Sequence, residues 1–378
     1  MYGELLYATG VLVSQLGLFL ISFRFIMILT KSFMPSALES LALRIGWFSE
    51  IAASLFISMS MAAPEIGISV SDSLSQSGMS SHSLALGVVL ASGWITFLLI
   101  PTLVWMEGSS EFRASDLFRD ILCYACSLYG LYWFMLYPSF WRMFVFVGAY
   151  GLYVYALCHG QHVHQLKRRL EREQQLIYQL APLDAIVNGN RVYLDAHLEI
   201  EPVDPAVAKS SISWEETLME RICVRSIPGT LTEKYCVLSL INAFVLQLAF
   251  SGLIGWISQS WIKSFGGISL AILPVILSLF AQATHIMGFV AGKVSMSQCM
   301  SSQCFAVLVG IAFPSLVRTA VSSVYPETPS RMFAYSGIAL GVLAVYSILN
   351  YKNGIVYFNK FKYFIFLYPL LIAGYIFI

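Results

Sequence analysis

The sequence predicts an all-α integral membrane protein with about ten membrane-spanning helices. Its composition is 58% hydrophobic and 14% aromatic, only 11% of its residues are charged, and its mean hydropathy is +0.73. These values lie far from those of an average soluble domain. The apolar runs are also the right length, because a helix needs roughly 20 residues to cross a hydrocarbon core about 30 Å thick. A third observation is their grouping, five before and five after a single long polar stretch.

The predicted spans divide the chain into a first five-helix half (1–159), a polar loop (160–233) and a second five-helix half (234–378). In order, they are Leu5–Thr30, Gly46–Asp72, Ser83–Trp105, Leu117–Tyr137, Trp141–His159, Lys234–Ser258, Gly267–Gly292, Ser297–Val317, Arg331–Asn350 and Ile355–Ile378. Because five is odd, the second half would be inverted relative to the first. Two such halves are typical of secondary transporters.

The distribution of basic residues predicts that the polar loop is cytoplasmic, or faces the matrix or stroma of an organelle. This orientation puts sixteen lysines and arginines on the loop side and four on the other side, Arg142, Lys263, Arg318 and Arg331. Basic residues favour the cytoplasmic side of a membrane. Both termini would then lie opposite the loop. The sequence does not choose between the plasma membrane and an organelle membrane, either mitochondrial inner membrane or endomembrane.

The polar loop is the candidate contact for other membrane-protein subunits, in addition to the lipid bilayer itself. Its run HGQHVH brings together His159, His162 and His164, but no nearby cysteine or carboxylate completes a tetrahedral metal set. An exposed helix end is therefore the favoured interpretation, and no cofactor is predicted. A net charge of +1, without a basic patch interleaved with aromatic residues, gives no indication of a nucleic-acid partner.

The segment SMAAPEIGISV, residues 60–70, places Pro64 and Glu65 within an otherwise apolar span. A charge at the bilayer centre costs roughly 2.5 to 3.5 kcal/mol, so an acid there is by default a functional candidate. Proline frees a backbone carbonyl, and the pair therefore predicts a broken helix with a cation site at the break. The alternative is that Glu65 is protonated and hydrogen-bonded to a neighbouring helix. The local sequence leaves both open.

The surrounding residues resemble the cation/calcium exchanger superfamily, most closely the potassium-dependent sodium/calcium exchangers. The run FMPSALESLALRIGWFSEIAASLFISMSMAAPEIGISV is similar to that family's first signature repeat, in which "VPSLE" precedes a helix ending in "GSSAPELFTS". LGVVLASGWITFLLI resembles "GTIVGSAVFNIL", FRDILCYACSLYGLYWF resembles its "FRD" span, and SSQCFAVLVGIAFPSL resembles "GSNIFDITVGLPVPWLL". The resemblance covers nearly the whole chain through the order and spacing of its motifs. It implies two inverted five-helix halves whose second and seventh helices meet at a central ion site.

The first repeat keeps the acid that the resemblance assigns to ion binding and loses oxygen atoms around it. Glu65 falls on the ion-binding glutamate of the family. Ala62 replaces a serine ligand, Leu55 replaces a threonine, and Thr96 stands where the next span should offer asparagine. The implied site is therefore weakened.

The second repeat departs further from the family pattern. Ile286 occupies the position of the second essential acid, and no Asp or Glu occurs between Lys234 and Glu327. Gln303 replaces an asparagine, and Ala306 replaces the aspartate that the family links to potassium dependence. The seventh and eighth spans therefore contribute no carboxylate.

A single carboxylate does not supply the negative charge that a calcium site needs, because calcium takes six to eight oxygen ligands, several of them charged. A monovalent cation or a proton needs only one negative charge. The candidate cation ligand is Glu65, and the candidate neutral ligands are Ser60, Thr96, Gln282, Thr284, His285, Gln298 and Gln303. His285 can instead pair with Glu65 in a proton-linked or structural contact.

Two functional hypotheses follow. The first, favoured by the loss of ligands in both repeats, is a degenerate exchanger that has lost calcium transport and serves as a structural or regulatory membrane subunit. The second is an active cation antiporter that uses Glu65 in a rebuilt site for sodium, potassium, protons or calcium. An enzyme is not predicted, because the chain has no HExxH motif, no serine and lysine pairing and no paired aspartates within the membrane.

Overall fold

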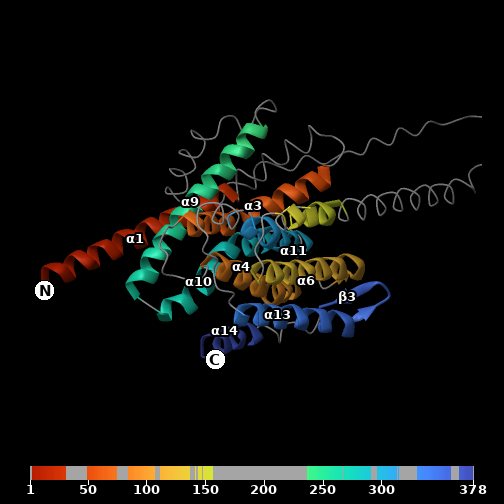
Figure 1. Cartoon of the computed structure of the whole chain (residues 1–378). Helices are drawn as coiled ribbons and strands as arrows, with labels where there is room; N and C mark the ends of the chain where they lie inside the picture. Colours follow the sequence, from red (N-terminus) through yellow and green to blue (C-terminus); the bar gives the residue numbers. More distant parts are fainter. Residues whose placement is uncertain are drawn as a thin grey trace, which may run out of the picture.

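A computed structural model shows a bundle of long helices with one small sheet (Figure 1). It describes residues 2–30, 49–74, 84–106, 111–136, 141, 144–146, 148–155, 236–265, 267–290, 296–312, 314, 330–358 and 366–377. The helices of the first half are α1 (Tyr2–Ile28), α3 (Ser49–Leu74), α4 (Leu84–Trp94), α5 (Ile100–Met106) and α6 (Ala114–Leu136), and a π-helical segment, η2 (Ile95–Leu99), joins α4 to α5. Those of the second half are α9 (Cys236–Phe265), α10 (Gly267–Val290), α11 (Met296–Phe305), α13 (Ser330–Leu349) and α14 (Leu367–Phe377), and the π-helical η5 (Ala306–Ile311) continues α11.

Most of the predicted spans coincide with a helix. Residues 144–146 and 148–155 of the fifth span are also helical. On length and composition alone, four segments within the described residues can cross a membrane: Thr9–Ile28, Leu84–Leu103, Val237–Phe265 and Arg331–Leu349. The chain is therefore a multi-pass membrane protein, and the polar loop lies outside the described residues.

Contacts between the helices fix their relative directions. α3 and α9 run parallel, because Ser60 contacts Gln247 and, 12 residues further along both helices, Asp72 contacts Gln259. α4 and α10 also run parallel, since Gly87 lies against Pro274 and Thr96 lies further along beside Gln282. The second and sixth spans thus share one direction, and the third and seventh share another.

The helix α3 continues through Pro64, so the predicted broken helix is wrong. Proline has no N–H to donate to the carbonyl four residues earlier, which is that of Ser60. In the structure this carbonyl accepts a hydrogen bond from the side-chain amide of Gln247 on α9, at 3.0 Å. A neighbouring helix therefore satisfies the backbone group that proline frees, as burial in hydrocarbon requires.

The same face of α9 packs tightly against α3 through small residues. A Cβ added at Gly67 would overlap Ser251 and lie 2.8 Å from the carbonyl oxygen of Leu248, and one added at Gly255 would lie 3.0 Å from the Cβ of Ser71. Small residues let helices approach closely in membranes. Gln247 also donates to the Thr30 hydroxyl at 2.9 Å, which ties the end of the first span to the same contact.

The buried carboxylate of Asp72 joins α3 to the start of α4. One oxygen accepts from the backbone N–H of Ala85 at 3.2 Å, and the other accepts from the Gln259 amide at 3.2 Å. The first N–H groups of a helix have no partner within the helix, and a carboxylate there also favours the helix dipole. Since the end of α3 meets the start of α4 in this way, the two helices run in opposite directions.

The last predicted span begins too early. Residues that were expected to be helical form the strand β3 (Ile355–Tyr357), which pairs with β2 (Tyr351–Lys352) and with β1 (Glu111–Arg113). The turn between β2 and β3 is Asn353–Gly354, and both residues have positive φ, 51° and 83°. Asn-Gly is the preferred pair for a two-residue hairpin turn, so this small sheet is an exception to the all-α prediction.

The hydrogen bond between Gln247 and Ser60 can be tested with a double-mutant cycle. In the natural chain, Gln247→Met should lower the free energy of unfolding by about 1 to 3 kcal/mol, because the Ser60 carbonyl is left buried without a donor. In a Pro64→Ala background the backbone N–H of the new alanine supplies that donor, and the same substitution should cost less. The measurement is denaturant unfolding of the purified protein in detergent micelles. The bond to Thr30 is present in both backgrounds and cancels, so equal losses in the two would contradict the assignment.

Candidate functional site

Glu65 is completely buried at the centre of the bundle, on α3. Its Oε1 accepts a hydrogen bond of 2.8 Å from the side-chain amide of Gln282 on α10. The second and seventh spans therefore meet at this carboxylate. Among the described residues, no lysine, arginine or histidine forms an ion pair with it.

Three further polar side chains surround the contact between Glu65 and Gln282. The Thr96 hydroxyl lies 3.4 Å from the side-chain carbonyl oxygen of Gln282 and 3.1 Å from the backbone carbonyl oxygen of Ser92. The side chains of Ser92 and Gln303 both lie near enough to the Glu65 carboxyl group to interact with it. The site thus draws on four helical segments, α3, α4 with η2, α10 and α11.

Several buried polar atoms of this site have no hydrogen-bond partner. They are Oε2 of Glu65, Oγ of Ser92, and both Oε1 and Nε2 of Gln303. Buried polar groups in proteins are almost always paired, and an unpaired cluster calls for an explanation such as a bound ion or water. A buried carboxylate surrounded by neutral polar side chains offers a place for a small cation or a hydrated proton.

Breaks in regular α-helix lie beside the site in both halves. Thr96 belongs to the π-helical segment η2, and Gln303 lies within one turn of the π-helical η5. A π-helical turn widens the helix and re-aims its side chains, and such turns are frequent at functional sites. The third helix of each half therefore carries a local distortion where it approaches Glu65.

The other predicted ligands lie elsewhere. Ser60 precedes Glu65 by five residues, which places it on another face of α3, and its carbonyl faces α9. His285 does not pair with Glu65, since its Nε2 lies 2.5 Å from the hydroxyl of Ser302, which itself donates to the Cys299 carbonyl. Thr284 is on α10, but its side chain is outside the described part of the structure.

No metal centre of the usual composition is found in the described residues, where no group of three or more His, Cys, Asp and Glu side chains lies together. His159, His162 and His164 of the HGQHVH run lie outside those residues. The prediction for that run stays untested.

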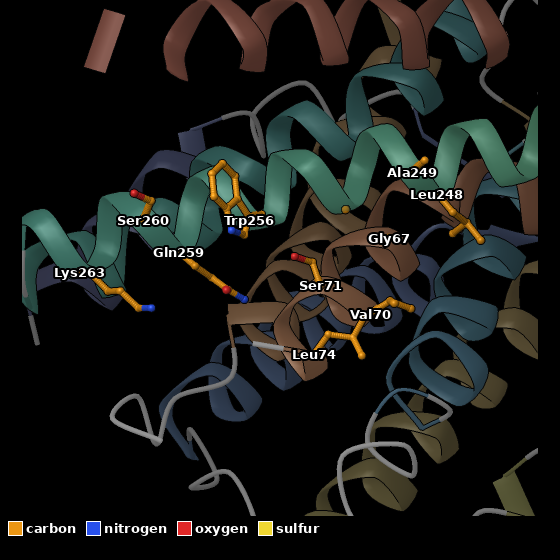
Figure 2. Close-up of a pocket in the computed structure, with 11 residues that line it drawn as sticks. Gly67, Val70, Ser71, Leu74, Leu248, Ala249, Trp256, Gln259, Ser260 and Lys263 are labelled. Atoms are coloured by element: carbon orange, nitrogen blue, oxygen red, sulfur yellow. The ribbon is translucent and has the colours of Figure 1, made fainter. Parts of the chain in front are cut away.

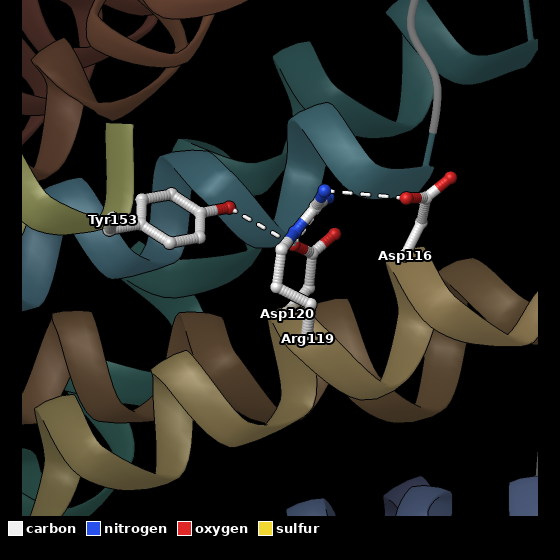
Figure 3. Close-up of polar contacts among 4 residues, drawn as sticks. All are labelled: Asp116, Arg119, Asp120 and Tyr153. Carbon is white, nitrogen blue, oxygen red and sulfur yellow. Dashed lines mark hydrogen bonds and ion pairs between the residues drawn. The ribbon is translucent and has the colours of Figure 1, made fainter. Parts of the chain in front are cut away.

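A second polar cluster lies on α6, in the span that contains FRD (Figure 3). Arg119 donates to a single oxygen of Asp120 from Nε and Nη2, both at 2.9 Å, and reaches Asp116 at 3.3 Å. The Tyr153 hydroxyl donates to the same Asp120 oxygen at 3.3 Å. The charge of the buried Asp120 is therefore balanced locally, and this cluster holds α6 to the helix of residues 148–155.

Sequence reasoning did not identify Ser92 and Gln247. Ser92 could have been found, because it lies four residues before Thr96 and so shares its helix face. Gln247 is the only amide side chain in the run AFVLQLAFSG. The carbonyl freed by Pro64 needs a donor, but nothing in the sequence states which helix supplies it.

The arrangement of helices matches that of a known transporter. The chain is similar to the crystal structure of the H+/Ca2+ exchanger CAX, with a TM-score of 0.58 and 13% sequence identity, and the alignment covers 98% of this chain and 89% of that chain. At this identity the likeness shows the fold alone. This is an integral membrane protein with an exchanger-like fold. No family model and no curated protein matches the sequence.

The cluster on α6 generates a stability prediction. Arg119→Ala should lower the free energy of unfolding by about 3 to 5 kcal/mol, because Asp120 would remain buried without its cation. Asp116→Asn should cost less than about 1 kcal/mol, since this side chain is 35% exposed and its ion pair is weak. Both variants would be unfolded by denaturant in detergent. Similar losses of unfolding free energy in the two variants would contradict a larger contribution from the buried pair of Arg119 and Asp120.

Proposed function

We propose that this chain is a divergent cation exchanger that binds a single positive charge at Glu65, taking a proton and a monovalent cation in turn, and that it no longer carries calcium. The exchanger-like fold supports a transport role. The residues around Glu65 support a site for one positive charge rather than two. The proposed activity is transport, with no enzymatic step.

The argument against calcium is electrostatic. Glu65 is fully buried, and the seventh and eighth spans supply only neutral side chains, Gln282, His285 and Gln303 among them. A divalent ion held by one carboxylate would leave a net positive charge in a region of low dielectric, which is strongly unfavourable. A monovalent cation or a proton leaves the site neutral.

The observation that carries the proposal is the set of neutral polar side chains around Glu65, whose Oε2 has no hydrogen-bond partner. Gln282 holds one carboxyl oxygen in place, and the other has no partner, although Ser92 and Gln303 lie close to the carboxyl group. These are hard oxygen ligands, of the kind that sodium and potassium ions prefer. A purely structural carboxyl group would be expected to have both oxygens hydrogen-bonded.

We also propose that the two halves are inverted repeats. The second and seventh spans, α3 and α10, meet at the site and run in opposite directions. The third and eighth spans each change from α-helix to π-helix beside it. These features support inverted halves. The resemblance of residues 33–70 to the first signature repeat supports the finer proposal that the relatives are the potassium-dependent sodium/calcium exchangers.

A second candidate is a structural or regulatory membrane subunit, with partners docking through residues 160–233. It is favoured by the absence of any acid in the sequence between Lys234 and Glu327, and by the hydrogen bond that already joins Glu65 to Gln282. In that role Glu65 would be a protonated packing residue.

Ion flux into proteoliposomes distinguishes the two candidates. We expect uptake of sodium or potassium driven by an opposing proton gradient, and no gradient-driven uptake of calcium. Glu65→Gln should abolish the uptake, because the amide cannot carry the balancing negative charge. Gln303→Leu should reduce it at least several-fold by removing a neutral oxygen.

Asp116→Asn, on the exposed edge of the α6 cluster, is the matched loss of one acid outside the site and should leave the flux unchanged. Calcium uptake that depends on Glu65 would contradict the loss of calcium transport. Absence of flux for every ion, with protein that elutes as a folded species, would favour the structural subunit.

A further inference from the structure

An open groove of about 990 Å³ runs between α3 and α9 on the outside of the bundle (Figure 2). On α3 it is lined by Gly67, Val70 and Leu74, and on α9 by a longer series that begins at Leu248 and ends at Lys263. It is separate from the site at Glu65, because none of the residues that line it contacts that carboxylate.

Each helix contributes a glycine to the lining of the groove, Gly67 from α3 and Gly252 from α9. A Cβ added at Gly252 would meet only the carbonyl oxygen of Gly67, at 3.7 Å, so there is open space beside this position. Nearby, Gly67 itself leaves no room for a side chain, because α9 lies directly on it. The two helices thus touch along a line and diverge from it, which leaves an outward-facing trough.

The polarity of the groove changes along α9. Ala249, Gly252 and Trp256 follow one another at three- to four-residue spacing and form an apolar stripe. The stripe then becomes polar at Gln259, Ser260 and Lys263. Figure 2 shows the side chains of Gln259 and Lys263 reaching from α9 toward the end of α3 that carries Ser71 and Leu74.

The length of the stripe matches one leaflet of a bilayer. From Ala249 to Lys263 the helix rises about 21 Å, at roughly 1.5 Å per residue. Half of a bilayer, including its headgroups, is about 20 to 22 Å thick. The apolar end of the groove therefore reaches toward the midplane, and the polar end lies at headgroup depth.

The positive charge at the polar end of the groove favours an anionic ligand. Lys263 is exposed, and within the described residues no acid forms an ion pair with it. The neighbouring Gln259 amide already donates to the buried Asp72, and the Ser260 hydroxyl accepts from Gln15. Among the described residues that line the groove, Lys263 carries the positive charge, so its ammonium group is the one suited to contact a phosphate.

We propose that this groove binds one anionic glycerophospholipid, with an acyl chain along Gly252 and Trp256 and the phosphate at Lys263. Trp256 is 58% exposed and would lie along the acyl chain. The proposal is independent of ion transport at Glu65.

Native mass spectrometry of the purified chain tests the site with phosphatidylglycerol and phosphatidylcholine of identical acyl chains. We expect the natural chain to retain one phosphatidylglycerol in preference to phosphatidylcholine. Lys263→Gln should weaken phosphatidylglycerol retention about fivefold, because one lysine near a membrane surface contributes about 1 kcal/mol toward an anionic lipid. Gly252→Leu should abolish retention of both lipids by filling the trough.

Matched controls are Lys352→Gln, an exposed lysine on β2, and Gly17→Leu on α1, where an added Cβ meets nothing within 4 Å. Both should behave as the natural chain does. Equal retention of the two lipids, or equal effects of Lys263→Gln and Lys352→Gln, would overturn the proposal. Retention that survives Gly252→Leu would also overturn it, and the exposed Lys263 variant keeps the test valid should the leucine variant fail to fold.

Discussion

The structure depends on the requirement that every backbone polar group in hydrocarbon has a partner within the protein. Pro64 would leave the Ser60 carbonyl unpaired, and Gln247 supplies the missing donor from α9. That contact fixes α9 against α3 in register, with glycines at the closest approach. A proline beside the acid is therefore compatible with a continuous α3, and Glu65 is held by packing on a regular helix.

With Glu65 fixed in this way, the electrostatics of the site follow from its neighbours. One buried carboxylate accepts a hydrogen bond from Gln282 and is surrounded by further neutral groups, among them Ser92 and Gln303. A single negative charge in such surroundings is neutralised by one positive charge. The ion pair of Arg119 and Asp120 on α6 does not change the net charge of the bundle interior, because its two charges compensate each other.

Periodicity and apolar run length predicted most of the spans, and Glu65 was identified because an acid in a long apolar run is costly. Other features depend on information that a single sequence does not contain. The continuity of α3 depends on a donor 183 residues further along the chain from Pro64, at Gln247, and the partner of His285 depends on how α10 packs against α11. The Asn353–Gly354 hairpin, in contrast, was readable from local turn chemistry and was hidden by the apolar residues that follow it.

The central claim, that Glu65 exchanges one proton for one monovalent cation, is tested most directly by counting protons. Sodium, potassium or calcium would be added to the purified protein in weakly buffered detergent solution, and the protons released per chain measured. The account predicts release of up to one proton with sodium or potassium, none with calcium, and none from Glu65→Gln. Release by calcium that is lost in Glu65→Gln, or identical traces from the natural chain and the variant with every ion, would contradict it.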